Sequence, residues 1–363
     1  MLRQQDVGYR IVVRRIVGIR EGRPLFSDAL GELVELSETH LTLSTAQGHL
    51  RVPVAQVHRA KRVPPTRRPT AAAVVALERA ADEAWPAPTR GQLGDWLLRS
   101  AEGWSGRANS ALPIGDPDRP LPAAVDAVER WYAEQGQPPI INTPLPLAAP
   151  VGAELDARGW AARPPVLVQT TPLPLRPTGT ASAARSTTTE QPSADGDTGT
   201  ATTDGQAGAD GQAGADGQAG ADGQAGVWSS AVVELASAPS AEWLAAAAGR
   251  KGGLPDAARH VLTAVDLVRF AHVYVDGTLV AVGRGTVTGQ GRWLGLSLIE
   301  VLPAARRQGL AVRVIHELAG WGVSSGATHA FLQVEQHNTA AVALYRRLGF
   351  STHHTYLTRV APQ

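Results

Sequence analysis

The chain has 363 residues, enough for two or three domains that each bury a core. It contains no cysteine, so disulfides, thiolate metal sites and cysteine nucleophiles are excluded. The net charge is +1, but residues 1–70 hold twelve Lys and Arg against six Asp and Glu, so only this end is expected to attract an anionic surface. No segment has the ~20 apolar residues that cross a membrane, and no signal-peptide pattern is present, so a cytoplasmic protein is expected.

Residues 1–65 are expected to form a small β domain. Short apolar or alternating runs separated by turn residues predict strands over 9–17, 31–36, 41–44 and 50–54. Four or five short strands in so few residues resemble an SH3-like barrel.

Residues 71–175 change to a mixture of helices and strands. The periodicity predicts helices over 71–85, 122–135 and 152–158 and strands over 95–99, 107–112, 140–141 and 166–170. This segment is expected to be an α+β lobe.

Residues 176–226 have almost no large apolar side chains, and the hexamer Asp-Gly-Gln-Ala-Gly-Ala recurs from Asp204, Asp210 and Asp216. A solenoid needs apolar side chains that stack inward, and this repeat has none. The composition therefore predicts a disordered, low-complexity linker.

Residues 227–363 are expected to form a second α+β domain. Strands are predicted over 227–235, 270–275, 279–285, 293–301, 330–335 and 352–358, and helices over 241–248, 310–323 and 339–348. Asp276-Gly277 is typical of a two-residue hairpin turn.

The joint between the strand ending at Val301 and the helix from Leu310 predicts an anion-binding loop. Pro303 stops the strand, a short basic loop follows, and the first amide groups of the helix have no intrahelical acceptor. These amides, the helix dipole and two arginines are expected to hold a pyrophosphate. The loop consists of Arg306, Arg307, Gln308, Gly309, Leu310 and Ala311.

This loop resembles the first signature of the GCN5-related N-acetyltransferases, which places an Arg, a Gly and a small residue as Arg306, Gly309 and Ala311 are placed here. The family's second signature is matched by 332–350, which contains a strand, an Asn, an Ala-rich helix with a Tyr, and a Gly-Phe stop. The resemblance implies the α+β acetyltransferase fold over 227–363.

The resemblance also implies that acetyl-CoA lies in a V-shaped gap between the strands ending at Val301 and Glu335. A backbone amide at Val301 or at a neighbouring residue would then stabilise the oxyanion, and Tyr345 would protonate the departing thiolate. Tyr345 also fits a core aromatic on an apolar helix face, and Asn338 fits either a cofactor contact or a helix cap.

Three further residues are candidates for the chemistry. Glu300 and Glu335 flank the gap and are candidate general bases, although each also fits a surface or salt-bridged carboxylate. Arg107 is a candidate for binding an acceptor carboxylate, and an exposed or paired arginine is the alternative. The histidines have no metal-ligand spacing, so no metal is expected.

The segment 152–160 resembles 344–350, but 71–175 has no Arg-x-x-Gly-x-Ala loop, so it is interpreted as a degenerate acetyltransferase-like lobe. A barrel, a degenerate lobe and an active lobe in this order resemble an actinobacterial subfamily that includes amino-acid acetyltransferases such as N-acetylglutamate synthases.

We therefore expect an acetyl-CoA-dependent N-acetyltransferase acting on a primary amine, such as glutamate. The open alternatives are a protein lysine or N-terminus as acceptor, and a non-catalytic acyl-CoA sensor whose barrel binds nucleic acid. The basic residues of that barrel also fit a solvated edge, and they are Arg59, Lys61, Arg62, Arg67 and Arg68.

Overall fold

A computed structural model describes residues 2–20, 22–45, 48–63, 69–175, 231–249 and 254–362. The chain divides into two units, residues 1–68 and residues 69–363, and each is considered by itself. The predicted linker over 176–226 lies outside the described residues, as does the start of the strand predicted over 227–235.

The first unit is a five-stranded antiparallel sheet in the order β4-β3-β2-β1-β5. Its strands are β1 (Arg10–Arg20), β2 (Arg23–Leu36), β3 (His40–Thr45), β4 (Gly48–Pro53) and β5 (Val57–Arg62). The buried core consists of Ile11, Val13, Leu33, Leu41, Leu43 and Val52. Among the described residues the terminal strands β4 and β5 do not pair with each other, so a closed SH3-like barrel is not confirmed.

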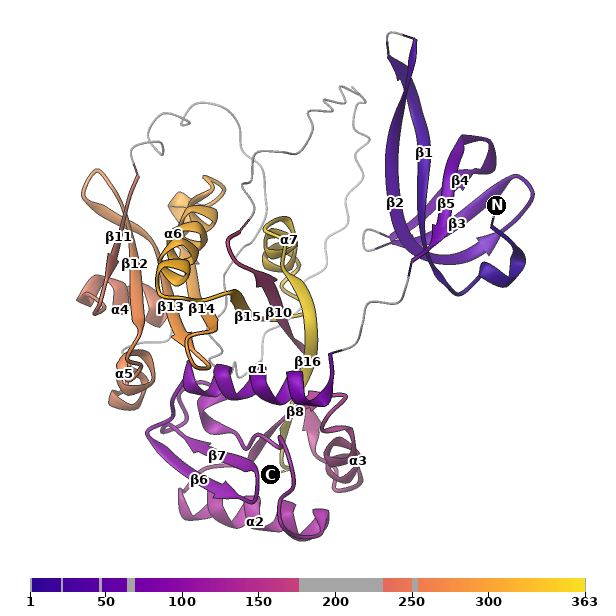
Figure 1. Ribbon diagram of the computed structural model, residues 1–363. Coiled ribbons are helices and arrows are strands. Elements are labelled where there is room, and N and C mark those ends of the chain that lie inside the picture. Colours follow the sequence, from indigo (N-terminus) through magenta and orange to yellow (C-terminus); the bar gives the residue numbers. More distant parts are fainter. Residues whose placement is uncertain are drawn as a thin grey trace, which may run out of the picture. The chain divides into compact units, whose positions relative to one another are not determined.

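The second unit is built on a nine-stranded sheet (Figure 1). Eight strands follow the order β11-β12-β13-β14-β15-β10-β16-β8, and β9 also pairs with β16. Every pair is antiparallel except β14 with β15. The strands are β8 (Ile140–Leu145), β9 (Ala161–Ala162), β10 (Val166–Pro172), β11 (Val232–Ala236), β12 (Val268–Val275), β13 (Thr278–Thr288), β14 (Trp293–Val301), β15 (His329–Glu335) and β16 (Ser351–Val360).

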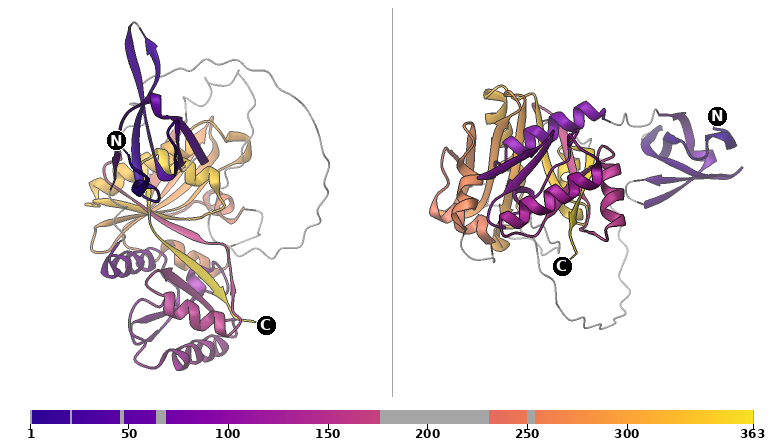
Figure 2. Two further views of the ribbon diagram at one scale, coloured as in Figure 1. Left: turned by 90° about the vertical axis from the view of Figure 1, so that its right-hand side faces the viewer. Right: turned by 90° about the horizontal axis from the view of Figure 1, so that it is seen from below.

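Strand β10 joins the two segments that the sequence analysis separates into lobes. Val168 lies opposite Gln333 of β15 on one side and opposite His354 of β16 on the other. Figure 2 shows β16 extending into the helices of the earlier segment. Strands of the segments 71–175 and 231–362 therefore belong to one sheet, in which β16 takes all its strand partners from the earlier segment.

Helices cover both faces of this sheet. Gly283 and Gly285 of β13 face Val314 and Leu318, whereas Arg284 between them bonds to the opposite helical layer. The helices are α1 (Ala71–Glu83), α2 (Leu121–Glu134), α3 (Ala149–Ala157), α4 (Ala241–Ala248), α5 (Asp256–Thr263), α6 (Leu310–Ser324) and α7 (Thr339–Arg347). Helix α6, predicted over 310–323, packs its buried Leu310, Val314 and Leu318 into the core. No described helix is long and apolar enough to cross a membrane.

The structure departs from the predicted elements at three places: one strand was predicted incorrectly, and two short elements were not predicted. The strand predicted over 107–112 begins instead with a 3₁₀ turn, Arg107–Asn109, because the Asn109 side chain folds the loop around itself. A short strand, β6 (Thr89–Leu93), pairs with β7 (Trp96–Ser100) and was not predicted. Helix α5 was also missed, although its buried residues Ala257, Ala258, Val261 and Leu262 have helical spacing.

The shared sheet predicts that the two segments depend on each other for folding. Fragment 227–363 produced alone leaves β16 without its neighbours, so we expect it to aggregate. Co-expression with fragment 69–175 should yield a soluble complex, measured by co-purification through a tag on one fragment. A soluble, folded monomer of 227–363 alone would contradict this expectation.

Candidate functional site

The loop before α6 has a backbone suited to hold an anion. Arg307 and Gly309 both adopt left-handed conformations, with φ of 68° and 75°. Gly309 is the N-cap of α6, and no side chain caps this helix end. A Cβ atom at Gly309 would meet no other atom within 4 Å, so the space beside the helix start is open. The amides of the first helical turn therefore have neither an intrahelical acceptor nor a capping side chain.

Arg306 braces this loop against the strand before it. Its Nε donates to the carbonyl oxygen of Val301 at 3.2 Å, and its guanidinium lies 3.8 Å from the Glu300 carboxylate. Part of its charge is therefore neutralised by Glu300. The expected attraction for a phosphate then depends more on the loop amides and on Arg307.

Strands β14 and β15 diverge beside this loop. Their parallel pairing covers only Trp293 with His329, Leu294 with Ala330 and Gly295 with Phe331. Beyond this point β14 contains a bulge at Leu298, which has a φ of 53°. A left-handed leucine is unusual, and a bulge bends its strand. The described pairing of β14 with β15 therefore ends before Val301 and Glu335, the residues between which the gap is expected, and the bulge at Leu298 has no sequence signal.

The backbone of Val301 faces this gap. The amide of Leu302 donates to the carbonyl of Val280 on β13 at 2.9 Å. Only alternate residues of an antiparallel strand bond to the same neighbour, so the groups of Val301 point away from β13. The Val301 amide therefore forms no ladder hydrogen bond with β13 and stays a candidate oxyanion donor.

Tyr345 lies on α7 in the same core cluster as the phosphate loop. Its side chain is 5% exposed and packs against Phe350, with ring centroids 5.9 Å apart. The cluster also contains Ala305 and Leu310, so the two sequence signatures meet in one core. Burial raises the pKa of the Tyr345 phenol, which keeps its proton at neutral pH. No described residue forms a hydrogen bond with this hydroxyl.

The other predicted polar residues are engaged in local contacts. Glu335 lies 2.8 Å from His337, and Glu300 is paired with Arg306 as described. Both carboxylates are partly exposed. Asn338 accepts a hydrogen bond from the Ala341 amide at 3.1 Å, which makes it the N-cap of α7. The capping alternative is thus present for Asn338, and neither glutamate stands out as the base.

Asn109 organises the loop that carries Arg107, and sequence reasoning missed its importance. Its Oδ1 accepts from the amides of Ala101 and Gly103, and its Nδ2 donates to the carbonyls of Trp104 and Ser105. The four distances lie between 2.7 and 3.0 Å. The residue is 4% exposed, so water cannot replace these bonds.

We expect Asn109→Ala to lower the free energy of unfolding of the second unit by about 3 kcal/mol, because four backbone groups lose their partner. Chemical denaturation of the full chain measures this. Asn338→Ala, which removes one capping bond, should cost only about 1 kcal/mol. Equal losses in the two variants would contradict the expectation.

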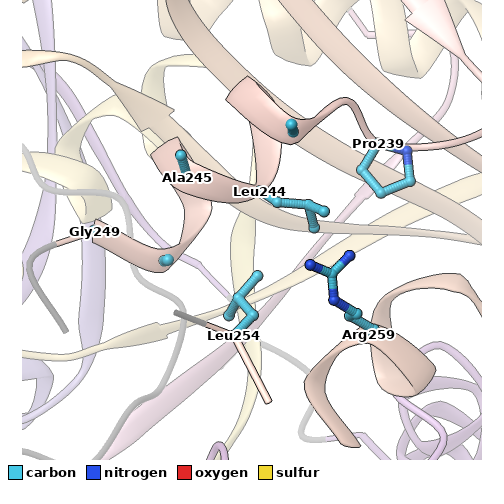
Figure 3. Close-up of a pocket in the computed structure, with 8 residues that line it drawn as sticks. Pro239, Leu244, Ala245, Gly249, Leu254 and Arg259 are labelled. Carbon is cyan, nitrogen blue, oxygen red and sulfur yellow. The ribbon is translucent and has the colours of Figure 1, made fainter. Parts of the chain in front are cut away.

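A separate pocket of about 530 Å³ lies between α4 and α5 (Figure 3). Leu244 and Leu254 line it, and the guanidinium of Arg259 points into it. None of the residues predicted for the site lines this pocket. Within the described residues there is no group of three His, Asp or Glu side chains arranged to hold a metal ion.

The basic edge of the first unit is partly neutralised. Arg62 pairs with Asp6 and lies over the ring of Tyr9, with 3.9 Å between its guanidinium carbon and the ring centroid. Arg67 and Arg68 lie outside the described residues. The charge of Arg62 is therefore partly balanced within the first unit, which makes this residue less available to bind a nucleic acid.

Comparison with known proteins identifies the family. The model of the family described as "Probable histone acetyltransferase Rv0428c C-terminal" matches residues 71–219 and 219–358. The chain belongs to this family. The prediction of a GCN5-related N-acetyltransferase is confirmed, and the protein is an acyltransferase enzyme.

Members of this and related families resemble the chain over different lengths. The probable histone acetyltransferase Rv0428c of Mycobacterium tuberculosis is 28% identical over 98% of this chain and 95% of that protein. An uncharacterized N-acetyltransferase of Bacillus subtilis, YobR, is 38% identical over 94 residues, which are 25% of this chain and 37% of that protein. A GCN5-related N-acetyltransferase from Kribbella flavida has a similar fold, with a TM-score of 0.50 and 15% identity over 82% of this chain and 97% of that one.

Proposed function

We propose that this protein transfers the acetyl group of acetyl-CoA to a primary amine. One observation carries the proposal: an uncapped helix start with open space at Gly309 lies at the end of the strand that diverges from β15. The loop fits the diphosphate of coenzyme A, and the gap fits its extended arm, which would pair with the free edge of β14.

When bound, acetyl-CoA supplies a thioester carbonyl carbon. The amine nitrogen forms a bond to this carbon, the carbon–sulfur bond breaks, the nitrogen loses a proton and the sulfur gains one. In this proposal the Val301 amide stabilises the oxyanion, and Tyr345 donates the proton to sulfur. Either Glu300 or Glu335 accepts the proton of the ammonium group, directly or through water.

The cosubstrate contacts in the proposal come from the loop and from the start of α7. The loop residues are Arg306, Arg307, Gln308, Gly309, Leu310 and Ala311. Asn338 stays a proposed contact through the part of its amide that does not cap the helix. Residues 71–175 shape the acceptor side of the site through Arg107, and the first unit is proposed to be an SH3-like accessory domain.

Two acceptors are compatible with this proposal. A small amino acid is supported by Arg107, and a protein lysine is supported by the description of the matched family and of its mycobacterial relative as probable histone acetyltransferases. Both acceptors need the same cosubstrate contacts.

The test uses the purified full chain with acetyl-CoA and a panel of small amines and lysine peptides. Release of free coenzyme A and the mass of the products are measured. We expect micromolar binding of acetyl-CoA by calorimetry and at least one acetylated product. Failure to bind acetyl-CoA would refute the proposal.

A further inference from the structure

A buried arginine without a carboxylate partner lies beneath the diverging strands. Arg284 of β13 is 1% exposed and donates to the carbonyl oxygens of Leu262, Ala84 and Val261 at 2.8, 2.9 and 3.2 Å. Neutral carbonyls satisfy its donors but do not balance its charge. It forms no ion pair with any described residue.

A second unbalanced arginine lies against the same tryptophan. The guanidinium carbons of Arg107 and Arg284 lie 5.2 and 5.3 Å from the ring centroid of Trp85. The Nε of Arg107 is buried without a hydrogen-bond partner, and Arg107 has no ion pair in the described part of the chain. Burial, and then the charge of Arg107, lowers the pKa of Arg284 to about 9, so Arg284 stays charged at neutral pH. Two arginine side chains thus lie against one ring, and neither has an ion pair with a described residue.

This cation pair lies beside the expected reaction centre. Arg284 is the register partner of Ser297 on β14, two residues beyond the last pair that joins β14 to β15. The hydroxyl of Ser297 is also buried without a partner. Leu298, the bulge residue, shares a core cluster with Trp85. Arg284 and Ser297 therefore lie where the pairing of β14 with β15 has ended, and Arg107 lies against the same tryptophan as Arg284.

We propose that the acceptor is a small amine that carries a carboxylate, and that Arg107 binds this carboxylate with Arg284 as the second charge. A carboxylate accepts two parallel hydrogen bonds from a guanidinium, and it balances the charge of the pair. Ser297 supplies a further donor, and the rings of Trp85 and Trp104, which stack with centroids 5.5 Å apart, form an apolar wall. The same two cations repel a lysine-rich segment. This inference rests on the proposed function and narrows its acceptor.

The experiment compares the twenty L-amino acids with their carboxamides and with a basic lysine-containing peptide. Turnover of the full chain is followed by release of free coenzyme A and by product mass. Binding is followed independently by tryptophan fluorescence, since Trp85 and Trp104 adjoin Arg107. The variants are Arg107→Met, the charge-preserving Arg107→Lys, and Arg79→Met, which removes an exposed arginine of α1 as a matched control. Arg107→Gln replaces Arg107→Met if the latter fails to fold.

We expect at least one amino acid to have a kcat/KM more than tenfold above that of its carboxamide. Arg107→Met should raise KM for that amino acid about a hundredfold and leave KM for acetyl-CoA unchanged. Arg107→Lys keeps the positive charge, so its KM for the amino acid should lie between those of the wild type and Arg107→Met. Arg79→Met should behave as the wild type. Equal use of carboxamides or the peptide, with no effect of Arg107→Met, would overturn the inference and leave the proposed function standing. Binding of acetyl-CoA with no response to any amino acid would also overturn it, whereas no binding of acetyl-CoA would overturn both.

Discussion

Gly309→Glu is expected to weaken binding of acetyl-CoA by roughly 100-fold or more. A carboxylate would occupy the open space beside the helix start, where the diphosphate is proposed to lie. Two unit charges about 4 Å apart near a protein surface repel by ~4 kcal/mol, so the electrostatic effect alone is enough. Isothermal calorimetry of the purified full chain measures the change in Kd.

The backbone strain of this substitution needs its own control. Gly309 has a φ of 75°, and a residue with a side chain costs ~1–2 kcal/mol in this conformation. Gly309→Gln has the shape of glutamate without its charge, so it should retain most of the affinity that Gly309→Glu loses. Gly326→Glu places the same carboxylate at another left-handed glycine with open surroundings, and there affinity should not change. Equal affinity of Gly309→Glu and the wild type would refute the assignment of the loop.

Tyr345→Phe is expected to lower kcat about 100-fold with little change in KM for acetyl-CoA. The phenol keeps its proton because burial raises its pKa, so it is able to donate that proton to a departing thiolate. Phenylalanine preserves the packing against Phe350, and no described partner of the hydroxyl is lost. The free energy of unfolding should therefore change by less than about 0.5 kcal/mol.

Tyr132→Phe is the matched control for this rate effect. The Tyr132 hydroxyl donates to the carbonyl oxygen of Arg99 at 2.8 Å in the core formed by α2 and its neighbours. Its removal should cost about 1 kcal/mol of stability and leave kcat unchanged. If Tyr345 takes part in the reaction, Tyr345→Phe lowers kcat without a loss of stability, whereas Tyr132→Phe lowers stability without a loss of kcat. Steady-state kinetics and denaturation of both variants measure this difference. An unchanged kcat in Tyr345→Phe would make Tyr345 a packing residue only.

Several predicted residues kept two interpretations until the structure placed them. Asn338 caps α7, and its position directly before an Ala-rich helix had already made capping one of its two interpretations. Glu300 was predicted on the strand, but its pairing with Arg306 depends on how the loop folds back. Glu335 pairs with His337 instead, so the two candidate bases have different partners. The sequence had no signal that distinguishes them as bases.

The amino-acid sequence alone determined the acetyltransferase family and indicated the loop that is proposed to bind phosphate. Both depend on neighbouring residues: a strand, a proline stop, a glycine and a helix start within some twenty positions, where local backbone geometry decides the structure. The same locality explains why most helices and strands of 227–363 were predicted.

Only the tertiary structure decided how the distant segments combine. Strand β10 lies between β15 and β16, so it joins in one sheet two segments that the low-complexity residues 176–226 separate in the sequence. The meeting of Arg107 and Arg284 over Trp85 depends on that union, because the three residues come from a loop, a strand and a helix end far apart in sequence. No local pattern encodes such contacts, since sheet order and side-chain packing determine which remote residues become neighbours.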